Sequence, residues 1–315
     1  MKRFSGLLLC VGLVGCGVGS LEVESDQVGA LDAELGATLT PGKVTLSNGV
    51  EMAYAVQGNP HGKPVILIHG YPDSHHTWDL NYQTLSRNYR VYGIDLRGLG
   101  SSSKNHASYT QADLSEDVVL FMNALGIQKA TLVGHSMGSL VAHRVAAFWP
   151  NRVERLVLVS SATTTFDHWA AHWIRQVLTC EPFPLPPEEG GCAQTMTDEE
   201  WADFVWYFQW STFYQPVPDA YLNTMVEQSL GSPRSVWLAI IEGMLEEDHV
   251  AKLADITAPT LILHGDQDVL FSVEDAQALK AAIPNATLKI YADTGHGLHA
   301  ERPTQFRQDL HAFLP

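Results

Sequence analysis

The apolar and polar positions of this chain follow a repeating pattern of short apolar runs and longer amphipathic segments. The apolar runs lie at 65–68, 91–94, 131–133, 156–159, 260–263 and 288–291. The segments with helical spacing lie at 79–87, 112–125, 137–148, 273–282 and 303–313. Short buried strands that alternate with helices are typical of a parallel sheet covered on both faces. The pattern predicts an α/β fold.

The first part of the folded region has a different pattern. Residues 44–46 and 51–55 flank Ser47, Asn48 and Gly49. An Asn-Gly pair between two alternating runs is a strong signal of a tight hairpin. We therefore expect the fold to begin with an antiparallel pair of strands.

The regular spacing breaks once, between the runs at 156–159 and 260–263. A strand–helix–strand unit usually takes roughly 30 residues, so this gap indicates an insertion. We assign residues 163–245 to a mainly helical cap, and residues 41–162 and 246–315 to the sheet-containing core. The cap holds six of the eight tryptophans, namely Trp169, Trp173, Trp201, Trp206, Trp210 and Trp237. We expect most of them to form the cap's own core and its contact with the sheet, and a minority to line a pocket.

The N-terminus has the pattern of an export signal. Lys2 and Arg3 precede an apolar run over 4–14, which is too short to span a bilayer and fits the apolar region of a secretory signal. The run ends in Leu-Val-Gly-Cys, and this ending resembles the lipobox of bacterial lipoproteins, in which Cys16 would carry the lipid. Cleavage elsewhere, with loss of Cys16, is the alternative.

The lipobox resemblance implies a lipoprotein signal peptide over 1–15 and a flexible tether over 16–40. The protein would be exported to the bacterial cell envelope and held to a membrane through its N-terminal lipid anchor. Because Gly17 rather than an aspartate follows the cysteine, the resemblance favours the outer membrane.

Two further cysteines, Cys180 and Cys192, flank a segment rich in proline, glycine and glutamate. Outside the cytosol a disulfide between them is the expected arrangement, with two free thiols as the alternative. No neighbouring histidine or cysteine has the spacing of metal ligands, so no metal site is predicted there.

Composition limits the partners of the folded part. The chain of 315 residues has 19 Lys+Arg against 35 Asp+Glu, a formal net charge of −16, and 45% hydrophobic residues. This acidic balance, without a basic cluster beyond the N-terminus, argues against nucleic acid and anionic lipid surfaces as partners. The hydrophobic content allows a sizeable core.

The segment 134–138 reads Gly-His-Ser-Met-Gly and lies between an apolar run and a helical segment. In a G-x-S-x-G turn the strand passes sharply into the helix, so the central residue takes a strained conformation and only small residues fit two positions away. The turn would present the Ser136 hydroxyl at the carboxyl end of the strand, beside the Met137 amide. A capping serine at a helix start is the alternative interpretation.

A serine nucleophile needs an adjacent base, which a third group must orient. His296 follows the last predicted strand, in Thr-Gly-His-Gly, and Asp268 follows the preceding strand. The order serine, acid, histidine is the one expected for a hydrolase built on such a sheet.

With these segments the chain, from about residue 41 to its end, resembles the α/β-hydrolase superfamily. His69-Gly70-Tyr71-Pro72 looks like the family's oxyanion loop. The resemblance implies that the Tyr71 and Met137 N–H groups form an oxyanion hole. The segment 95–101 also resembles a family pattern, for which we expect a structural role.

Several residues compete for the catalytic roles. Asp266 lies two residues before Asp268, and Asp167 is the nearest acid if the family's earlier position is used. The family pattern favours Asp268 as the acid and His296 over His299 as the base. For His75, His76 and His135 we expect packing or hydrogen-bonding roles; no pair of these has zinc spacing.

The serine also narrows the reaction. Relatives that open epoxides or displace halide have an aspartate at this turn, although the segment 69–78 has an epoxide-hydrolase-like or dehalogenase-like look. We predict a serine hydrolase that cleaves small or medium acyl esters or lactones as small-molecule substrates, without cofactor or metal. The alternatives are a C–C bond hydrolase, a perhydrolase, an epoxide-hydrolase-like enzyme, and a lipoprotein that binds a ligand without turnover.

Overall fold

The computed structural model describes residues 39–85, 88–166, 168–180 and 193–314. Its centre is an eight-stranded sheet with the order β1-β2-β4-β3-β5-β6-β7-β8. The strands are β1 (Thr40–Thr45), β2 (Glu51–Gly58), β3 (Lys63–Ile68), β4 (Tyr89–Ile94), β5 (Ala130–His135), β6 (Val153–Val159), β7 (Thr260–Gly265) and β8 (Ala286–Tyr291). From β4 to β8 all neighbours are parallel. The predicted α/β architecture is confirmed.

The predicted hairpin is also present. β1 pairs antiparallel with β2, with Thr45 opposite Glu51, and β2 continues antiparallel onto β4. Gly49 turns the chain with φ +88°, a conformation that glycine adopts without steric cost. β1 begins at Thr40, which the sequence had placed in the tether.

Four of the five predicted helices of the core are present within one residue of their expected bounds. The helices of the core are η1 (His75–Trp78), α2 (Tyr82–Leu85), α3 (Gln111–Ala124), α4 (Met137–Phe148), η2 (Pro150–Arg152), η3 (Val250–Asp255), α9 (Val273–Ala282), α10 (Leu298–Glu301) and α11 (Pro303–Phe313). The prediction of one helix over 79–87 was wrong. The chain instead forms the short helix η1, which Ser74 caps by accepting a hydrogen bond from the His76 N–H, and Asp79 and Leu80 lie in the turn after it.

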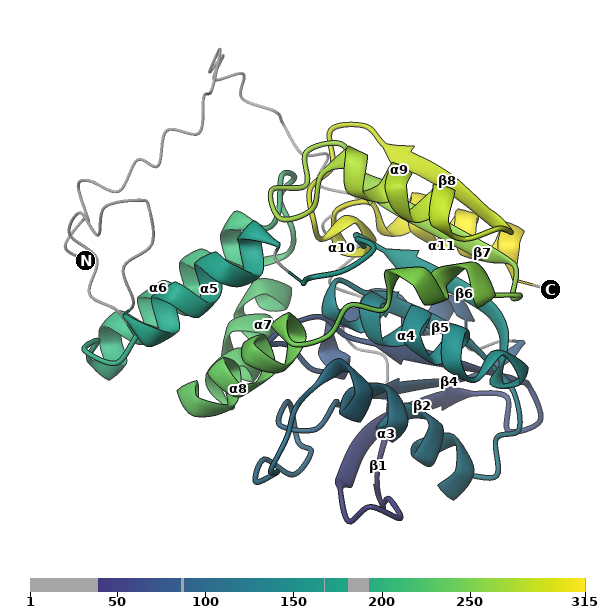
Figure 1. Cartoon of the computed structure of the whole chain (residues 1–315), viewed down its shortest axis with the longest axis horizontal. Helices are drawn as coiled ribbons and strands as arrows, with labels where there is room; N and C mark the ends of the chain where they lie inside the picture. Colours follow the sequence, from purple (N-terminus) through teal and green to yellow (C-terminus); the bar gives the residue numbers. More distant parts are fainter. Residues whose placement is uncertain (1–38, 86–87, 167, 181–192, 315) are drawn as a thin grey trace.

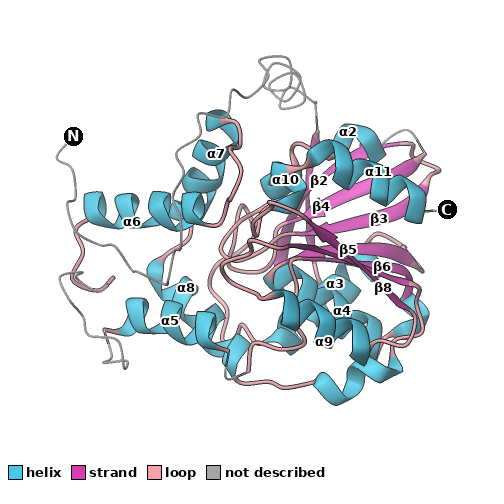
Figure 2. Cartoon of the chain, turned by 90° about the horizontal axis from the view of Figure 1, so that it is seen from above, coloured by secondary structure: helices cyan, strands magenta, loops and turns pink. Residues whose placement is uncertain are grey.

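Helices cover both faces of the sheet. α3, α4 and α9 lie on one face, and α2, α10 and α11 on the other (Figure 2). Along β3, Val65 and Leu67 pack into one hydrophobic cluster, whereas Ile66 and Ile68 pack into the other. Successive side chains of a strand point to opposite faces, so an unbroken apolar run fills two cores.

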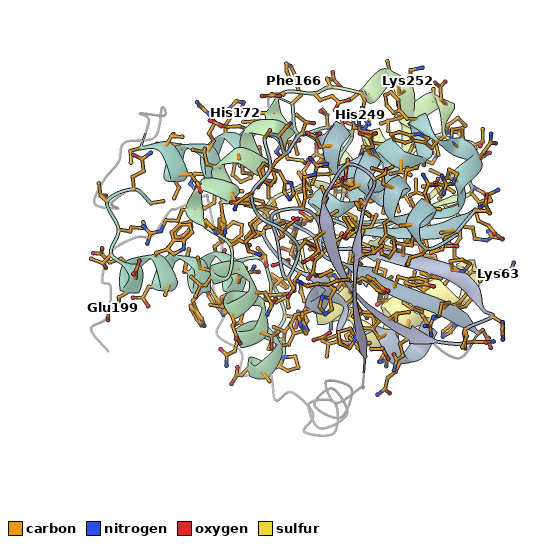
Figure 3. The ribbon with its side chains drawn as sticks, turned by 90° about the horizontal axis from the view of Figure 1, so that it is seen from below. Lys63, Phe166, His172, Glu199, His249 and Lys252 are labelled. Carbon is orange, nitrogen blue, oxygen red and sulfur yellow. The ribbon has the colours of Figure 1, made fainter. Side chains whose placement is uncertain are left out.

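The inserted segment forms four helices between β6 and β7: α5 (Trp169–Thr179), α6 (Asp198–Ser211), α7 (Asp219–Leu230) and α8 (Arg234–Leu245). They form a separate layer at one side of the sheet domain (Figure 1). Figure 3 shows Glu199, on α6, and Lys63, at the amino end of β3, at opposite ends of the molecule. The helical layer therefore stands beyond the carboxyl ends of the parallel strands, where α/β proteins bind ligands.

The tryptophans of this layer differ from the expectation. Trp201 and Trp237 are buried in its core with Val205 and Phe208. Trp169, Trp206 and Trp210 are instead 55%, 43% and 51% exposed. The residues of α6 are aromatic nearly all round, so a helix that buries one face leaves the rings of the other face in solvent.

Residues 1–38, including Cys16, lie outside the described residues, as do 86–87, 167, 181–192 and 315. Within the ranges that the structure describes, no helix has the length and apolar character needed to cross a bilayer.

Candidate active site

Ser136 lies at the sharp turn between β5 and α4. Its backbone has φ +51° and ψ −122°, and its N–H donates to the Val159 carbonyl at 2.9 Å. A positive φ is unfavourable for a residue with a side chain and is maintained only by its surroundings. The Ser136 side chain makes no capping hydrogen bond with α4. The structure therefore gives no support to the capping interpretation.

The two glycines of the turn have no room for a side chain. A Cβ on Gly134 would lie 2.3 Å from the Gly138 carbonyl oxygen. A Cβ on Gly138 would lie 2.4 Å from the carbonyl oxygens of Ile68 and His69. β5, α4 and the end of β3 approach so closely here that only glycine fits, which fixes the position of Ser136.

Asp268 and His296 are brought together from separate loops. Asp268 follows β7, His296 follows β8, and Asp268 Oδ2 lies 2.8 Å from His296 Nδ1. An ionised carboxylate only accepts hydrogen bonds, so Nδ1 carries the proton and donates it. In the neutral ring Nε2 is then the acceptor, and it is buried with no hydrogen-bond partner among the described residues. The free nitrogen is the one that a general base needs.

The charge of Asp268 is well supported. Its Oδ1 accepts hydrogen bonds from the N–H groups of Leu270 and Phe271 at 2.9 and 3.0 Å, and its side chain is fully buried. Burial alone would raise the pKa of Asp268. The adjacent His296 ring and the hydrogen bonds outweigh burial and hold this pKa below its usual value.

The competing residues make other contacts. Asp266 is exposed and its carboxylate accepts only a 3.4 Å bond from the Thr294 N–H. His299 packs against Trp78, and burial lowers its pKa to about 3. Asp167 lies outside the described residues. The geometry therefore favours Asp268 and His296 as the acid and base.

The residues expected to have structural roles make structural contacts. His135 Nε2 donates to the His296 carbonyl at 3.0 Å, and the ring of His75 donates to Asp95 at 2.7 Å. In the segment after β4, Arg97 forms two bonds to Asp117, at 2.6 and 2.7 Å. These contacts hold the loops around the site.

The cap directly contacts the His296 loop. The His296 N–H donates to the Thr212 carbonyl at 2.9 Å. A Cβ on Gly295 would lie 2.7 Å from the Tyr214 nitrogen, and one on Gly297 would lie 2.2 Å from the Phe213 ring. The two glycines of Thr-Gly-His-Gly therefore allow the segment after α6 to pack on this loop, a contact that the sequence did not reveal.

The predicted oxyanion donors lie beside Ser136. A Cβ on Gly70 would lie 3.1 Å from the Ser136 Cβ, so the Gly70–Tyr71 backbone runs against the turn. In the described part of the chain, neither the Tyr71 N–H nor the Met137 N–H has a hydrogen-bond acceptor. Two unpaired donors next to a nucleophile are suited to bind a developing oxyanion.

Two pockets meet at this site. The Ser136 pocket is lined by Ser136, Met137 and mainly apolar side chains, including Leu140, Ile174, Ile241, Met244 and Phe271. The His296 pocket is lined by His296 with Asp73, Thr77, Gln209, Thr212, Phe213, Tyr221, Met225 and His299. Tyr71, Phe208 and Leu270 line both pockets and form the boundary between them.

Asp73 is a polar residue of the site for which the sequence pattern predicted no role. It is 6% exposed and its carboxylate accepts a 2.6 Å hydrogen bond from Gln209 Nε2. Burial raises the pKa of Asp73 to about 6. Two features of the sequence could have indicated this role. Asp73 directly follows His-Gly-Tyr-Pro, and a glutamine lies within the aromatic run 206–210.

Cys180 ends α5 and is disulfide-bonded. Cys192, its predicted partner, lies outside the described residues, so this pairing stays a prediction. In the described ranges no group of three or more His, Cys, Asp or Glu side chains is arranged to hold a metal ion.

Comparisons with known proteins agree with the fold. A family profile described as alpha/beta hydrolase fold matches residues 63–181, and one described as serine aminopeptidase, S33, matches residues 227–303. The AB hydrolase superfamily protein YisY of Bacillus subtilis is 28% identical over 247 residues, which cover 76% of this chain and 87% of the relative. A non-heme chloroperoxidase of Streptomyces lividans is 29% identical over 282 residues, which cover 87% of this chain and 99% of the relative.

Solved structures give the same result. A hydrolase from Pseudomonas aeruginosa superposes with a TM-score of 0.70 at 26% identity, over 89% of this chain and 99% of that one. With its sheet order and inserted helices, this chain has the α/β-hydrolase fold, and its sequence is similar to those of hydrolases of that superfamily.

Proposed function

We propose that this protein is a serine hydrolase that cleaves carboxylic esters through an acyl-enzyme. One observation carries the proposal. His296 donates from Nδ1 to buried Asp268 and keeps an unpartnered Nε2, at a site that also holds Ser136 on a strained turn. An imidazole that a buried carboxylate orients, with Nε2 free, can act as the base for a serine nucleophile.

In the first half of the reaction, Ser136 Oγ attacks the ester carbonyl carbon and its proton passes to His296 Nε2. The carbonyl oxygen becomes an oxyanion, which the Tyr71 and Met137 N–H groups bind. The tetrahedral intermediate collapses, the C–O bond to the alcohol breaks, and His296 gives its proton to the leaving oxygen.

In the second half, His296 takes a proton from a water molecule, whose oxygen attacks the acyl carbon on Ser136. Collapse of the second tetrahedral intermediate releases the carboxylic acid and returns the proton to Ser136. Throughout, Asp268 fixes the orientation and tautomer of the imidazole and stabilises its positive charge.

The Ser136 pocket supports acyl esters and lactones of small or medium size as substrates. Its lining is mainly aliphatic and aromatic, so it would bind an alkyl chain by excluding water from it. The expected products are an alkanoic acid and an alcohol, or a hydroxy acid from a lactone.

A fluorophosphonate probe and a panel of p-nitrophenyl esters test the proposal. The folded wild type should be labelled and should hydrolyse the esters, and Ser136→Ala should do neither. Ser101→Ala, at an exposed serine, is the matched control and should behave as wild type. Equal labelling of Ser136→Ala, or no labelling of folded wild type, would contradict the assignment.

Perhydrolysis is a second candidate, favoured by the similarity to a non-heme chloroperoxidase. Hydrogen peroxide in place of water would attack the same acyl-enzyme and release a peracid, which oxidises halide. Peracid formation from an ester and hydrogen peroxide, lost in Ser136→Ala, would support this activity. If the protein hydrolyses esters but forms no peracid, the acyl group is transferred to water and not to hydrogen peroxide.

We further propose that the protein is exported and anchored to the outer membrane through a lipid on Cys16. The disulfide at Cys180 supports an oxidising compartment outside the cytosol. Cys16→Ser should move the protein from the membrane to the soluble fraction. An unchanged distribution would refute the anchor without affecting the proposed chemistry.

A further inference from the structure

We propose that the His296 pocket is a subsite for a protonated amine, which Asp73 binds, on the alcohol part of the ester. This inference rests on the proposed ester hydrolysis. It names the substrate class: alkanoate esters of amino alcohols.

The carboxylate of Asp73 faces this pocket with unused acceptor capacity. Oδ1 accepts from Gln209 Nε2 at 2.6 Å and Oδ2 accepts from Thr77 Oγ1 at 3.2 Å. Each carboxylate oxygen has two acceptor positions. Thr77, on η1, and Gln209, on the cap helix α6, hold the orientation of Asp73. The carboxylate can still accept a hydrogen bond from a donor in the pocket.

The charge of Asp73 has no permanent counter-ion in the pocket. His296 lines the same pocket and its protonated ring would attract this carboxylate, but as the general base it has to be neutral when the ester binds. The two hydrogen-bond partners of Asp73 are a neutral hydroxyl and a neutral amide, and no lysine or arginine lines the described pocket. The neighbouring His135 and His299 are kept neutral, because burial lowers the pKa of each. A buried carboxylate without a cation is unfavourable, and an ammonium group in the pocket would remove that penalty.

The walls of the pocket also suit a cation. Tyr71, Phe208, Phe213 and Tyr221 line it, and the negative faces of aromatic rings attract ammonium groups. An anionic group would meet both the carboxylate and these rings. A neutral hydroxyl would bind Asp73 but would leave its charge uncompensated.

The reaction itself decides which half of the ester enters each pocket. His296 gives its proton to the leaving alcohol oxygen, so the alcohol part lies toward the pocket that His296 lines. The acyl part stays with Ser136 in the apolar pocket. The amine is therefore expected on the alcohol, a few bonds from the ester oxygen.

Two esters of the same shape test this inference. In 2-(dimethylamino)ethyl butyrate a protonated nitrogen takes the place of the branching carbon of 3-methylbutyl butyrate. Wild type should prefer the amine ester by at least about tenfold in kcat/KM, as expected for a charge-assisted hydrogen bond. Asp73→Asn should bring this ratio close to one, and Glu227→Gln, an equal change of charge at an exposed site on α7, should leave it unchanged.

The controls separate this inference from the proposed function. Hydrolysis of 3-methylbutyl butyrate that disappears in Ser136→Ala reports ester hydrolysis alone. A wild-type ratio near one, or a ratio that Asp73→Asn preserves, would overturn the amine subsite. Preference for 2-hydroxyethyl over propyl butyrate, with no preference for the amine ester, would overturn it in favour of a neutral donor.

A binding measurement covers the case in which Asp73→Asn does not fold. The product 2-(dimethylamino)ethanol should inhibit wild type at a concentration at least about tenfold lower than 3-methylbutanol does. Equal inhibition by the two alcohols would also overturn the proposal.

Discussion

The two pockets of the site share a boundary but have opposite chemistry. The Ser136 pocket is closed by aliphatic and aromatic side chains such as Ile174, Ile241 and Met244. The His296 pocket holds a buried carboxylate, a glutamine and a tyrosine, and its polar groups bond to one another.

Both pockets use the same reacting groups, but they recognise a substrate differently. The apolar pocket binds any alkyl group that fits, and one methylene more or less in the acyl chain changes the rate only modestly. The polar pocket contains a charge that is satisfied only by a complementary group. We infer that the Ser136 pocket limits the size of the acyl part of the ester and that the His296 pocket selects the chemical group on the alcohol part.

Ser136→Ala should have the largest effect, because it removes the nucleophile on which the turnover of every ester depends. We expect ester turnover to fall by about 10⁶-fold for amine and neutral esters alike. The free energy of unfolding should stay within about 1 kcal/mol of wild type, because only a small, partly exposed hydroxyl is lost. Steady-state kinetics and chemical unfolding measure the two quantities; retained turnover would contradict the assignment of the nucleophile.

Asp268→Asn should come next, with a loss of about 10⁴-fold in kcat. An amide in place of the carboxylate would favour the wrong imidazole tautomer of His296. Asp266→Asn, at the exposed neighbour, is the control and should keep most of the activity. The reverse result would exchange the roles of these two acids.

Ala171→Phe should fill the apolar pocket and leave the polar pocket unchanged. Ala171, on α5, lines the Ser136 pocket and not the His296 pocket. We expect turnover of octanoate esters to fall by about 10- to 100-fold relative to acetate esters, while the preference for the amine ester persists. Loss of that preference would show that the pockets do not act separately.

The preference for the amine ester should depend on pH. Because the pKa of Asp73 is raised to about 6, Asp73 is charged above this value and neutral below it. The preference should be largest near pH 7, where Asp73 is charged and the amine of the ester is protonated, and should decrease severalfold as the pH falls through 6. Between pH 5 and 8 the neighbouring His299 and Tyr221 stay neutral, since burial lowers the pKa of the first and raises that of the second.

The ratio of kcat/KM for the two esters measures this pH dependence. Both esters require the same His296 base, so its protonation cancels in the ratio. A ratio that does not change between pH 5 and pH 8 would show that Asp73 does not bind the amine.

Asp73→Asn should have its smallest effect on turnover of the neutral ester, but it should change the stability of the fold. Folding raises the pKa of Asp73 from 3.8 to about 6, so its ionised form weakens the fold as the pH rises through this window. We expect Asp73→Asn to stabilise the protein at pH 8 by up to about 3 kcal/mol, and to have little effect at pH 4. Urea unfolding at the two pH values measures this; strong destabilisation at pH 8 would indicate a structural carboxylate.

Local patterns in the sequence predicted the elements of the core. α4, α9 and α11 have the expected bounds, and the strands extend the apolar runs by a few residues at most. These predictions succeed because helix and strand periods, glycine requirements and hairpin turns depend on neighbours in the chain. The turn at Ser136 is of this kind.

The partners of the site depended on contacts between distant residues. Asp268 and Asp266 are two positions apart in one loop, and only the packing of that loop on His296 separates them. The bond between Asp73 and Gln209 joins residues 136 positions apart, and the exposure of Trp206 and Trp210 depends on which face of α6 meets the rest of the cap.

Local spacing in the sequence predicts the α/β architecture, the place of the insertion and the order of the candidate nucleophile, acid and base. Contacts between distant segments determine which acid meets His296, that the cap holds the His296 loop, and that a second pocket contains Asp73. Burial and buried charge arise only when segments far apart in the chain pack together, so no local pattern predicts them.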